Sequence, residues 1–213
     1  MRQPEARQGE AAQIRRDGVE QLARAVRALG DACAETAVER AELDDITATL
    51  HQLTERLRAA TDDDPYSGLV MRPVDYSIPE SPMPLNPIVG ACSPVRPDVT
   101  LRFRDGEVVG TAIFTRRFTG PPDFAHGGIS AMLADQIVAV TPMAIGVRSI
   151  TRSLELQYRR PLPLHEVVEL WGVCEPTADG FRARFTITAR GKVAVEGSAE
   201  LVTYEQFASG GGA

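Results

Sequence analysis

The stretch GPPDFAHGGISAMLADQIVAV, residues 120–140, decides the fold. From Ile129 onward, apolar side chains recur at every fourth position, which predicts a helix with a wide apolar face. The helix is expected to begin at Gly127 and Gly128. It should end before Pro142, because proline disfavours helical backbone in the residue that precedes it.

Two glycines open this predicted helix and a single carboxylate interrupts its apolar face. Glycine allows close approach to the backbone, and a helix start offers unpaired N–H groups with a partial positive charge. Such a start suits a carbonyl oxygen that becomes negative during a reaction. Asp135 lies about 10 Å further along the helix than Gly128, and it is the one charged residue from 127 to 147. A carboxylate on an apolar helix is costly unless it is partnered, titrated or used.

A His-Gly-Gly triplet at 126–128, followed by Asp135 nine residues after the histidine, resembles the signature of hotdog-fold acyl-CoA thioesterases. The nearest resemblance is to the PaaI-like branch, the phenylacetyl-CoA-type thioesterases, over roughly residues 99 to 204. It implies an α+β hotdog fold, in which an antiparallel sheet wraps around a central helix. It also implies dimers whose sheets join into one, with two active sites at the interface.

The resemblance also implies roles for the residues around the helix start. Asp135 would be the nucleophile or the general base that activates water; the alternative is an aspartate that only bonds a backbone amide. Gly127, the first glycine, would donate its N–H to the thioester carbonyl, and the helix geometry allows Gly128 as well. His126 would steady the loop or contact the thioester, although a histidine before a helix is more often structural.

Further predicted site residues lie outside the helix. Thr151, contributed by the partner subunit, would hydrogen-bond the water or the carboxylate, with Ser153 as the alternative if the strand register is shifted by two; an ordinary strand threonine is the other possibility. Arg159 and Arg160 would meet the coenzyme A phosphates, unless they are a solvated surface pair. Phe124 is expected to help set the size of the acyl pocket.

One position departs from the family pattern. Many relatives carry Asn or Gln six residues before the histidine, where it helps to hold the carbonyl, and this chain has Gly120. Asp123 or the backbone would then replace that side chain, or the activity would be weak.

Four regions are expected along the chain: a helical extension at 1–61, a proline-rich linker or wrapping segment at 62–98, the hotdog domain at 99–205 and a disordered tail at 206–213. Residues 1 to about 9 are expected to be disordered. Between residues 10 and 60, apolar residues have heptad spacing that is interrupted around Thr36 to Arg40. This pattern predicts either two helices or one long helix with a weak point, and Gly30-Asp31 could end one helix and cap another. Residues 88–91 are a candidate strand or turn over the acyl pocket.

Six strands are predicted, at residues 99–104, 107–116, 149–159, 166–175, 181–190 and 193–204. Asp105-Gly106 is a typical hairpin turn between the first two. Leu154, Leu156 and Tyr158 alternate with polar residues, which predicts that they face the interior.

Composition narrows the classes of function. The net charge is −6, and residues 1–60 carry 9 Arg against 11 Asp and Glu, which argues against nucleic acid as a partner. No apolar run is expected to approach the roughly 18 residues that a membrane span needs, and the N-terminus is polar and charged, so neither a membrane span nor a signal peptide is expected. Three scattered cysteines and three histidines in 213 residues indicate a cytoplasmic protein without a metal site, and we expect no cofactor.

The sequence therefore predicts an acyl-CoA thioesterase that forms a homodimer or homotetramer. The N-terminal helices would pack on the body or on their own copy in an oligomer; a DNA-binding role for them is disfavoured by charge. The alternative function is an acyl-CoA-binding regulatory protein without turnover. A hotdog hydratase or dehydratase is disfavoured, because no second acid or base is placed as those enzymes require.

Overall fold

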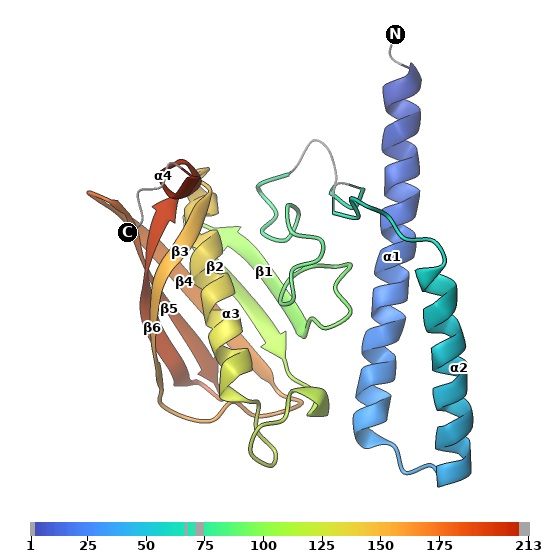
Figure 1. Ribbon diagram of the computed structural model, residues 1–213. Coiled ribbons are helices and arrows are strands. Elements are labelled where there is room, and N and C mark those ends of the chain that lie inside the picture. The colour runs from blue at the N-terminus through green and yellow to red at the C-terminus, as the bar shows by residue number, and fades with distance from the viewer. Residues whose placement is uncertain (1–2, 67, 71–74, 209–213) are drawn as a thin grey trace.

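An antiparallel sheet of six strands wraps around one long helix in the computed structural model of the chain (Figure 1), and a helical region precedes them. The structure describes residues 3–66, 68–70 and 75–208. This is the predicted hotdog arrangement, and the helix α3 (Gly127–Val140) has the bounds that its sequence indicated.

The body begins with a hairpin, continues through α3 and ends with four strands. Its strands are β1 (Asp98–Arg104), β2 (Glu107–Ile113), β3 (Ser149–Tyr158), β4 (Val167–Thr177), β5 (Gly180–Ala189) and β6 (Lys192–Thr203). Three short helices complete it: η1 (Arg116–Phe118), η2 (Thr141–Ile145) and α4 (Tyr204–Ala208). The second strand is shorter than predicted because the chain turns into η1. Asp105 and Gly106 form the hairpin turn with positive φ angles of 53° and 82°.

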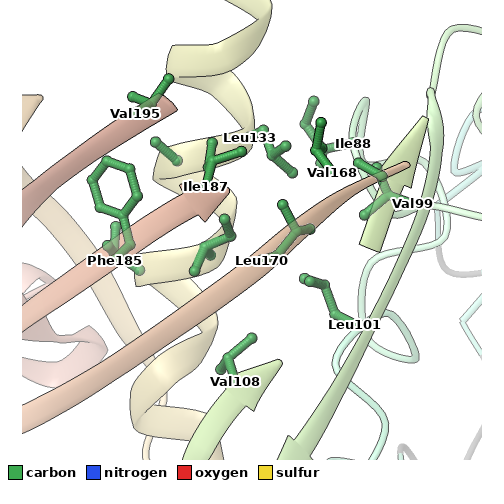
Figure 2. Packing of buried hydrophobic residues seen from close by; sticks show 14 of the residues in the cluster. Ile88, Val99, Leu101, Val108, Leu133, Val168, Leu170, Phe185, Ile187 and Val195 are labelled. Atoms are coloured by element: carbon green, nitrogen blue, oxygen red, sulfur yellow. The ribbon is translucent and has the colours of Figure 1, made fainter. Parts of the chain in front are cut away.

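One core joins the sheet to α3 (Figure 2). Leu133 of α3 packs among strand residues that include Phe185 and Ile187, and Ile88 from the segment before the body joins them. A Cβ atom at Gly172 of β4 would lie 2.6 Å from Ile137 Cγ2. Glycine is needed at this position because the helix lies so close to the strand.

The run Gly127–Ile145 has 19 residues and a mean hydropathy of 1.5. By length and composition it could cross a membrane, so the expectation that no apolar run is long enough was wrong. Half of this run is buried inside the body, which is typical of the core helix of a folded domain.

Strand β3 lies at one edge of the sheet, whose order is β1-β2-β4-β5-β6-β3. Its pairing with β6 shifts register between Thr151 and Ser153, which marks a β-bulge. Leu154 and Leu156 are half-buried, but Tyr158 is 55% exposed. The predicted burial of Tyr158 was wrong, because at this end of the edge strand the side chain covers the start of α3 and not the core.

The N-terminal half contains α1 (Gln3–Glu35) and α2 (Arg40–Arg58). Two helices are therefore present, and the break lies at residues 36–39, where the apolar spacing is interrupted; the other candidate, Gly30-Asp31, does not end a helix. Asp31 bonds to Thr115 and Arg117 next to η1, at 2.6 Å and 2.8 Å, so contact with the body supports the last turns of α1. Residues 3–9 are helical and not disordered, and of the predicted tail 206–208 belong to α4 while 209–213 lie outside the described residues.

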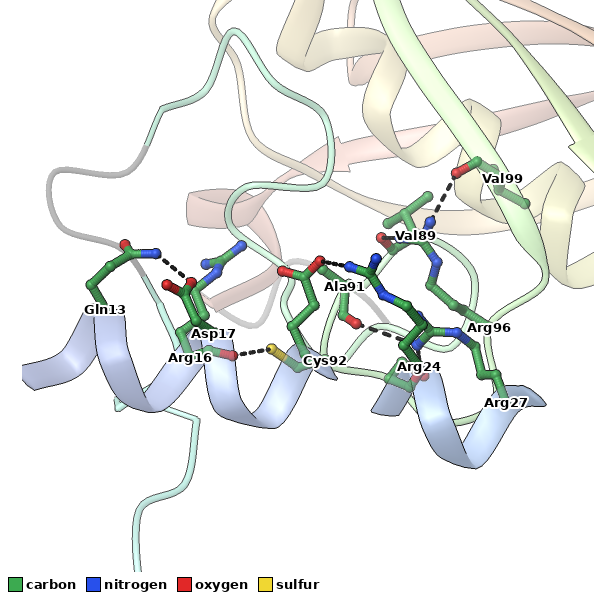
Figure 3. A network of polar contacts seen from close by, with 12 residues as sticks. Gln13, Arg16, Asp17, Arg24, Arg27, Val89, Ala91, Cys92, Arg96 and Val99 are labelled. Carbon is green, nitrogen blue, oxygen red and sulfur yellow. Dashed lines mark hydrogen bonds and ion pairs between the residues drawn. The ribbon is translucent and has the colours of Figure 1, made fainter. Parts of the chain in front are cut away.

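Helix α1 holds the wrapping segment against the body (Figure 3). The Arg27 guanidinium donates to the carbonyl oxygens of Ala91 and Ser93, at 3.3 Å and 2.6 Å. Cys92 is buried beneath α1, and burial raises the pKa of its thiol. Residues 88–91 form a turn, not a strand. Carbonyl groups that no regular structure pairs are thus satisfied by arginine side chains.

Candidate active site

The glycine end of α3 leaves one backbone donor open. His126 is the N-cap, and its Nδ1 accepts a hydrogen bond from the N–H of Gly128 at 2.9 Å. The N–H groups of Ile129 and Ser130 bond to the His126 carbonyl. Among the described residues no partner is recorded for the N–H of Gly127. Of the two predicted donors, Gly127 is therefore the one left for a ligand oxygen, and His126 has a structural role as the cap.

Tyr158 covers this helix start. Its hydroxyl donates to the Gly127 carbonyl oxygen at 2.9 Å, and its ring lies 3.4 Å from the place of a Cβ on Gly127. Sequence reasoning missed this residue, since the strand alternation indicated an interior position. Only the distance in space between the end of β3 and the start of α3 could have revealed it.

The acid end of α3 opens into a cavity of about 660 Å³. Asp135 is exposed on α3 and lines this cavity. No hydrogen bond or ion pair is recorded for its carboxylate within the described part of the chain. Asp135 is thus neither sealed in the interior nor held by a structural partner, which leaves the carboxylate available to a ligand or a water molecule.

Thr151 lines the same cavity from the start of β3. Its Oγ1 is buried and has no hydrogen-bond partner among the residues that the structure describes, which is unusual for a hydroxyl. Ser153, beyond the β-bulge, is exposed and lies outside the cavity lining. The resemblance implied a threonine from the partner subunit; here Asp135 and Thr151 of one chain share a cavity.

The wrapping segment closes the other side of this cavity. Asn86 donates through Nδ2 to Gln136 Oε1 at 2.7 Å, and its Oδ1 accepts from the N–H groups of Ile88 and Val89 at 2.8 Å and 3.1 Å. Gln136, next to Asp135, is 7% exposed. This bond fixes the wall of the cavity to the helix turn that carries Asp135. A polar residue beside Asp135 in an apolar helix was the signal that sequence reasoning passed over.

Most of the cavity wall is apolar. The aromatic and aliphatic side chains on it are Tyr66, Val70, Tyr76, Pro82, Met83, Ala139, Val140, Met143, Ile150 and Tyr204. The polar lining residues are Asn86, Asp135, Gln136, Arg148, Ser149 and Thr151. The Arg148 guanidinium lies 5.3 Å from the centre of the Tyr204 ring. An apolar group of a ligand fits these walls, with its reactive atoms toward the polar side chains.

Phe124 and Arg160 line a separate hollow of about 370 Å³. Arg190 and Lys192, which sequence reasoning did not select, lie on the same hollow. Arg190 bonds to Glu166 and thereby holds the pKa of that carboxyl below its ordinary value. No ion pair is recorded for Lys192 within residues 75–208. The hollow therefore presents cationic groups beside an aromatic ring, a combination suited to phosphate and a planar base.

The two predicted arginines are placed differently. Arg159 pairs with Glu196 at 2.8 Å and is not part of the hollow's lining. Arg160 lines the hollow, and its guanidinium donates to the Val193 carbonyl oxygen at 2.8 Å.

Gly120 packs directly against His126. A Cβ atom at Gly120 would lie 2.7 Å from His126 Cα, so no side chain fits without moving the loop. The Gly120 N–H donates to the Phe124 carbonyl oxygen at 2.9 Å. Asp123 is exposed with a positive φ of 67°, and it does not line the Asp135 cavity. The tight turn between 119 and 125 thus explains the glycine at this position.

No group of three His, Cys, Asp or Glu side chains is placed to hold a metal ion within residues 3–66, 68–70 and 75–208.

Comparison with known proteins gives the following result. No family model matches the sequence. The chain is similar to the crystal structure of the thioesterase superfamily protein RHA08564, with 28% identity and a TM-score of 0.73 over 87% of this chain and 94% of that chain. A hypothetical thioesterase with coenzyme A from Streptococcus pneumoniae TIGR4 is 22% identical over 50% of this chain and 89% of that chain, with a TM-score of 0.48. The PaaI protein of the E. coli phenylacetic acid degradation operon is 15% identical over 49% of this chain and 78% of that chain, with a TM-score of 0.46.

The similarity to RHA08564 confirms the hotdog fold and the resemblance to thioesterases. The 87% of this chain that it covers is far more than the half that the body occupies. The similarity therefore extends into the helical and wrapping regions that precede the body.

Proposed function

We propose that this chain, which resembles the thioesterase superfamily in fold and sequence, hydrolyses an acyl-CoA thioester to a free acid and coenzyme A in the manner of the PaaI-like branch. The observation that carries the proposal is that one helix has two polar groups without a recorded hydrogen-bond partner. The N–H of Gly127 has no recorded partner among the described residues, and Asp135 faces an apolar cavity without one.

In this proposal the Gly127 N–H binds the thioester carbonyl oxygen and stabilises the negative charge that develops on it. Asp135 then takes a proton from a water molecule whose oxygen attacks the carbonyl carbon, or attacks that carbon itself to form an anhydride that water hydrolyses. In both routes the carbon–sulfur bond breaks, and the coenzyme A thiolate leaves and takes up a proton that the water supplied. The buried Thr151 hydroxyl holds that water or the carboxylate. Arg160 and Lys192 meet the phosphates of coenzyme A.

The two groups work together most directly across two chains. Within one chain the cavity of Asp135 does not include Gly127. Strand β3 begins beside the acid end of α3, where Ser149 Oγ lies 3.4 Å from the Ala139 carbonyl oxygen, and it ends beside the glycine end, where Tyr158 bonds to Gly127. Antiparallel pairing of two β3 edges would bring the glycine end of one chain to the acid end of the other. An unpaired edge strand of this length favours such pairing.

The substrate class follows from the cavity wall. Its apolar lining from the wrapping segment and from η2 favours an apolar acyl group, aliphatic or aryl, over a charged one. We expect turnover to rise from acetyl-CoA to longer or aromatic acyl-CoAs.

A second candidate is an acyl-CoA-binding regulatory protein without turnover. It is favoured by Gly120, which leaves the carbonyl without the side-chain donor that many relatives have, and by the helical extension. The same cavity would then bind the acyl group for sensing only.

Incubation of the full-length protein with a panel of acyl-CoAs, with detection of the released thiol, tests the proposal. Cys33 is exposed and would react with the thiol reagent, so the assay is run on the Cys33→Ser variant. We expect release of coenzyme A from at least the apolar members of the panel, and its loss in Asp135→Asn. Binding of acyl-CoA without turnover anywhere in the panel would refute the enzyme and favour the regulatory protein.

A further inference from the structure

Helix α2 is an amphipathic helix whose apolar face the described chain covers only in part: Leu43 and Leu50 are half-buried, and the other apolar residues of this face are exposed. None of its 19 residues is buried, although its apolar residues recur at steps of three and four: Leu43, Ile46, Leu50, Leu53 and Leu57. Both of its ends are tied to α1, through the short connection at 36–39 and through the ion pair of Arg15 with Asp62. The two helices therefore form an antiparallel hairpin (Figure 1).

This hairpin keeps a row of apolar side chains in solvent, which we call the hairpin seam. Its members and their exposed fractions are Leu22 43%, Val26 41%, Ile46 38%, Leu53 43% and Leu57 57%. Leu22 and Leu53 are equally distant from the connection, so they lie at the same level of the hairpin. Scattered exposed leucines are ordinary, but a heptad-spaced row along two adjacent helices is the pattern of a helix–helix interface.

The body does not use this seam. Helix α1 faces the wrapping segment with other residues: Ala23 is 4% exposed, and Arg27 bonds to the carbonyl oxygens of Ala91 and Ser93. The seam residues Leu22 and Val26 both lie to the same side of Ala23 around the helix, on the surface that remains open. An occupant of the seam must therefore come from outside the chain.

We infer that the hairpin seam is covered by the same seam of a second copy of this chain, with α2 antiparallel to α2 in a four-helix bundle. Charge selects this occupant. Glu42 directly precedes Leu43, and Arg56 directly precedes Leu57; both leucines belong to the heptad-spaced apolar row of α2. Glu42 and Arg56 therefore lie on the same side of this row, at opposite ends of α2. No ion pair is recorded for either within residues 3–66. A two-fold antiparallel pairing sets Glu42 of each copy beside Arg56 of the other, twice per interface.

Other arrangements are less suited to these charges. A parallel pairing would set like charges side by side along α2, which is unfavourable. Residues 1–60 carry 9 Arg and 11 Asp and Glu, a net charge of −2, so a nucleic acid is repelled.

The hairpin contact leaves the β3 edge free. Helix α1 meets the body at η1, where Asp31 bonds to Thr115 and Arg117, and the strand that leads to η1 is β2, far from β3 in the order of the sheet. One protomer can therefore pair through β3 and through the hairpin at once. Two β3-paired dimers joined by hairpins make a tetramer.

The first test is the molar mass of the full-length protein by light scattering and sedimentation velocity. The double variant Leu53→Glu/Leu57→Glu places charges in the seam and is expected to halve the mass, with the circular dichroism of a folded sheet retained. Ala48→Glu, on the opposite face of α2, is the matched control and should keep the parent mass. An unchanged mass in the double variant overturns the inference.

A charge exchange tests the antiparallel pairing itself. Glu42→Arg and Arg56→Glu each set like charges together and are expected to raise the dissociation constant of the assembly about tenfold. The combined Glu42→Arg/Arg56→Glu variant restores opposite charges and should return the dissociation constant to its parent value. Failure of the combined variant to recover, with both single variants weakened, overturns the antiparallel self-pairing. Activity does not enter either measurement, so the result is independent of the proposed reaction.

Discussion

The two ends of α3 differ in what they leave open. At the glycine end almost every backbone group has a hydrogen-bond partner. His126 caps the Gly128 N–H, Tyr158 bonds to the Gly127 carbonyl, and among the described residues only the Gly127 N–H is left without a recorded partner. At the acid end a carboxylate and a buried hydroxyl face a cavity of about 660 Å³. One end can hold an oxygen and the other can act on a carbon, but two helical turns separate them. Each end is thus half of a site, which is the reason to expect a second chain in the reaction.

The largest effect should come from the acid end. Asp135→Asn keeps the shape of the side chain and removes its ability to attack or to accept a proton, so kcat is expected to fall by about a hundredfold to ten-thousandfold. Single-turnover release of coenzyme A measures the loss. Thermal unfolding and binding of a non-hydrolysable acyl-CoA analogue should match the parent protein. Near-normal rates would show that the Asp135 carboxylate takes no part in the reaction.

The glycine end is tested by removing its one free donor. Gly127 is the first residue of α3, where proline is tolerated, and His126 has the extended backbone, φ −63° and ψ 137°, that the residue before a proline prefers. Gly127→Pro should therefore leave the helix intact and lower kcat by about a hundredfold to a thousandfold, the effect of losing one oxyanion donor.

Gly127→Ala is the matched control for this substitution. Its Cβ would meet Tyr158 at 3.4 Å, an ordinary contact, and its N–H is kept. Alanine should thus retain most of the activity that proline loses. Equal losses in both variants would assign the effect to crowding against Tyr158 and not to the missing donor.

Mixing the two inactive variants sharpens the comparison between the ends. If each site joins the glycine end of one chain to the acid end of another, a heterodimer of Asp135→Asn and Gly127→Pro has one intact site. Exchange of subunits at equal concentrations should then restore about a quarter of the parent activity, because half of the dimers are mixed and each has one working site of two. No recovery after verified subunit exchange would place both groups of a site in the same chain.

Local pattern was enough to predict most of the fold. The bounds of α3 follow from Gly127, which starts it without a Cβ, and from Pro142, which has no N–H to continue the helix. Thr141 before this proline nevertheless keeps helical angles, φ −60° and ψ −41°, and the chain continues into η2. The strands follow from alternation and from turns such as Asp105-Gly106, whose positive φ angles are local properties. The interruption of the apolar spacing around residues 36–40 marks the helix break correctly. The other candidate, Gly30-Asp31, lies inside α1 because contacts with η1, far along the chain, hold its last turns.

The candidate site could be predicted only where its residues lie in one segment of the chain, so that their spacing fixes their relative positions. Asp135 and the glycines share a helix, so their relation could be derived from helical geometry alone. Asn86, which fixes Gln136 at 2.7 Å, and Tyr158, which covers Gly127, come from segments whose position depends on tertiary packing. Even Gly120 is explained by a close approach to His126 within the turn, which spacing does not reveal.

The smallest effect is expected at Thr151, where activity and stability should move in opposite directions. A buried hydroxyl without a hydrogen bond costs about 1 kcal/mol or more of folding free energy, and within the described part of the chain Thr151 Oγ1 is such a group. Thr151→Val keeps the shape and removes the hydroxyl, so the free energy of unfolding should rise by about 1 kcal/mol. The loss of one hydrogen bond to the attacking water or to the carboxylate should lower kcat about tenfold. Urea unfolding and steady-state rates measure the two effects.

Thr151→Ser is the matched control, since it keeps the hydroxyl and should retain more activity than valine. If valine instead lowered the stability, Oγ1 would have a partner in the assembled protein, and the hydroxyl would belong to the structure. If valine raised the stability and left kcat unchanged, the hydroxyl would contribute neither to the stability of the fold nor to the reaction. If the Thr151 hydroxyl is present for its chemistry, valine should raise the stability and lower the rate. An unpaired polar group destabilises the fold until a ligand bonds to it.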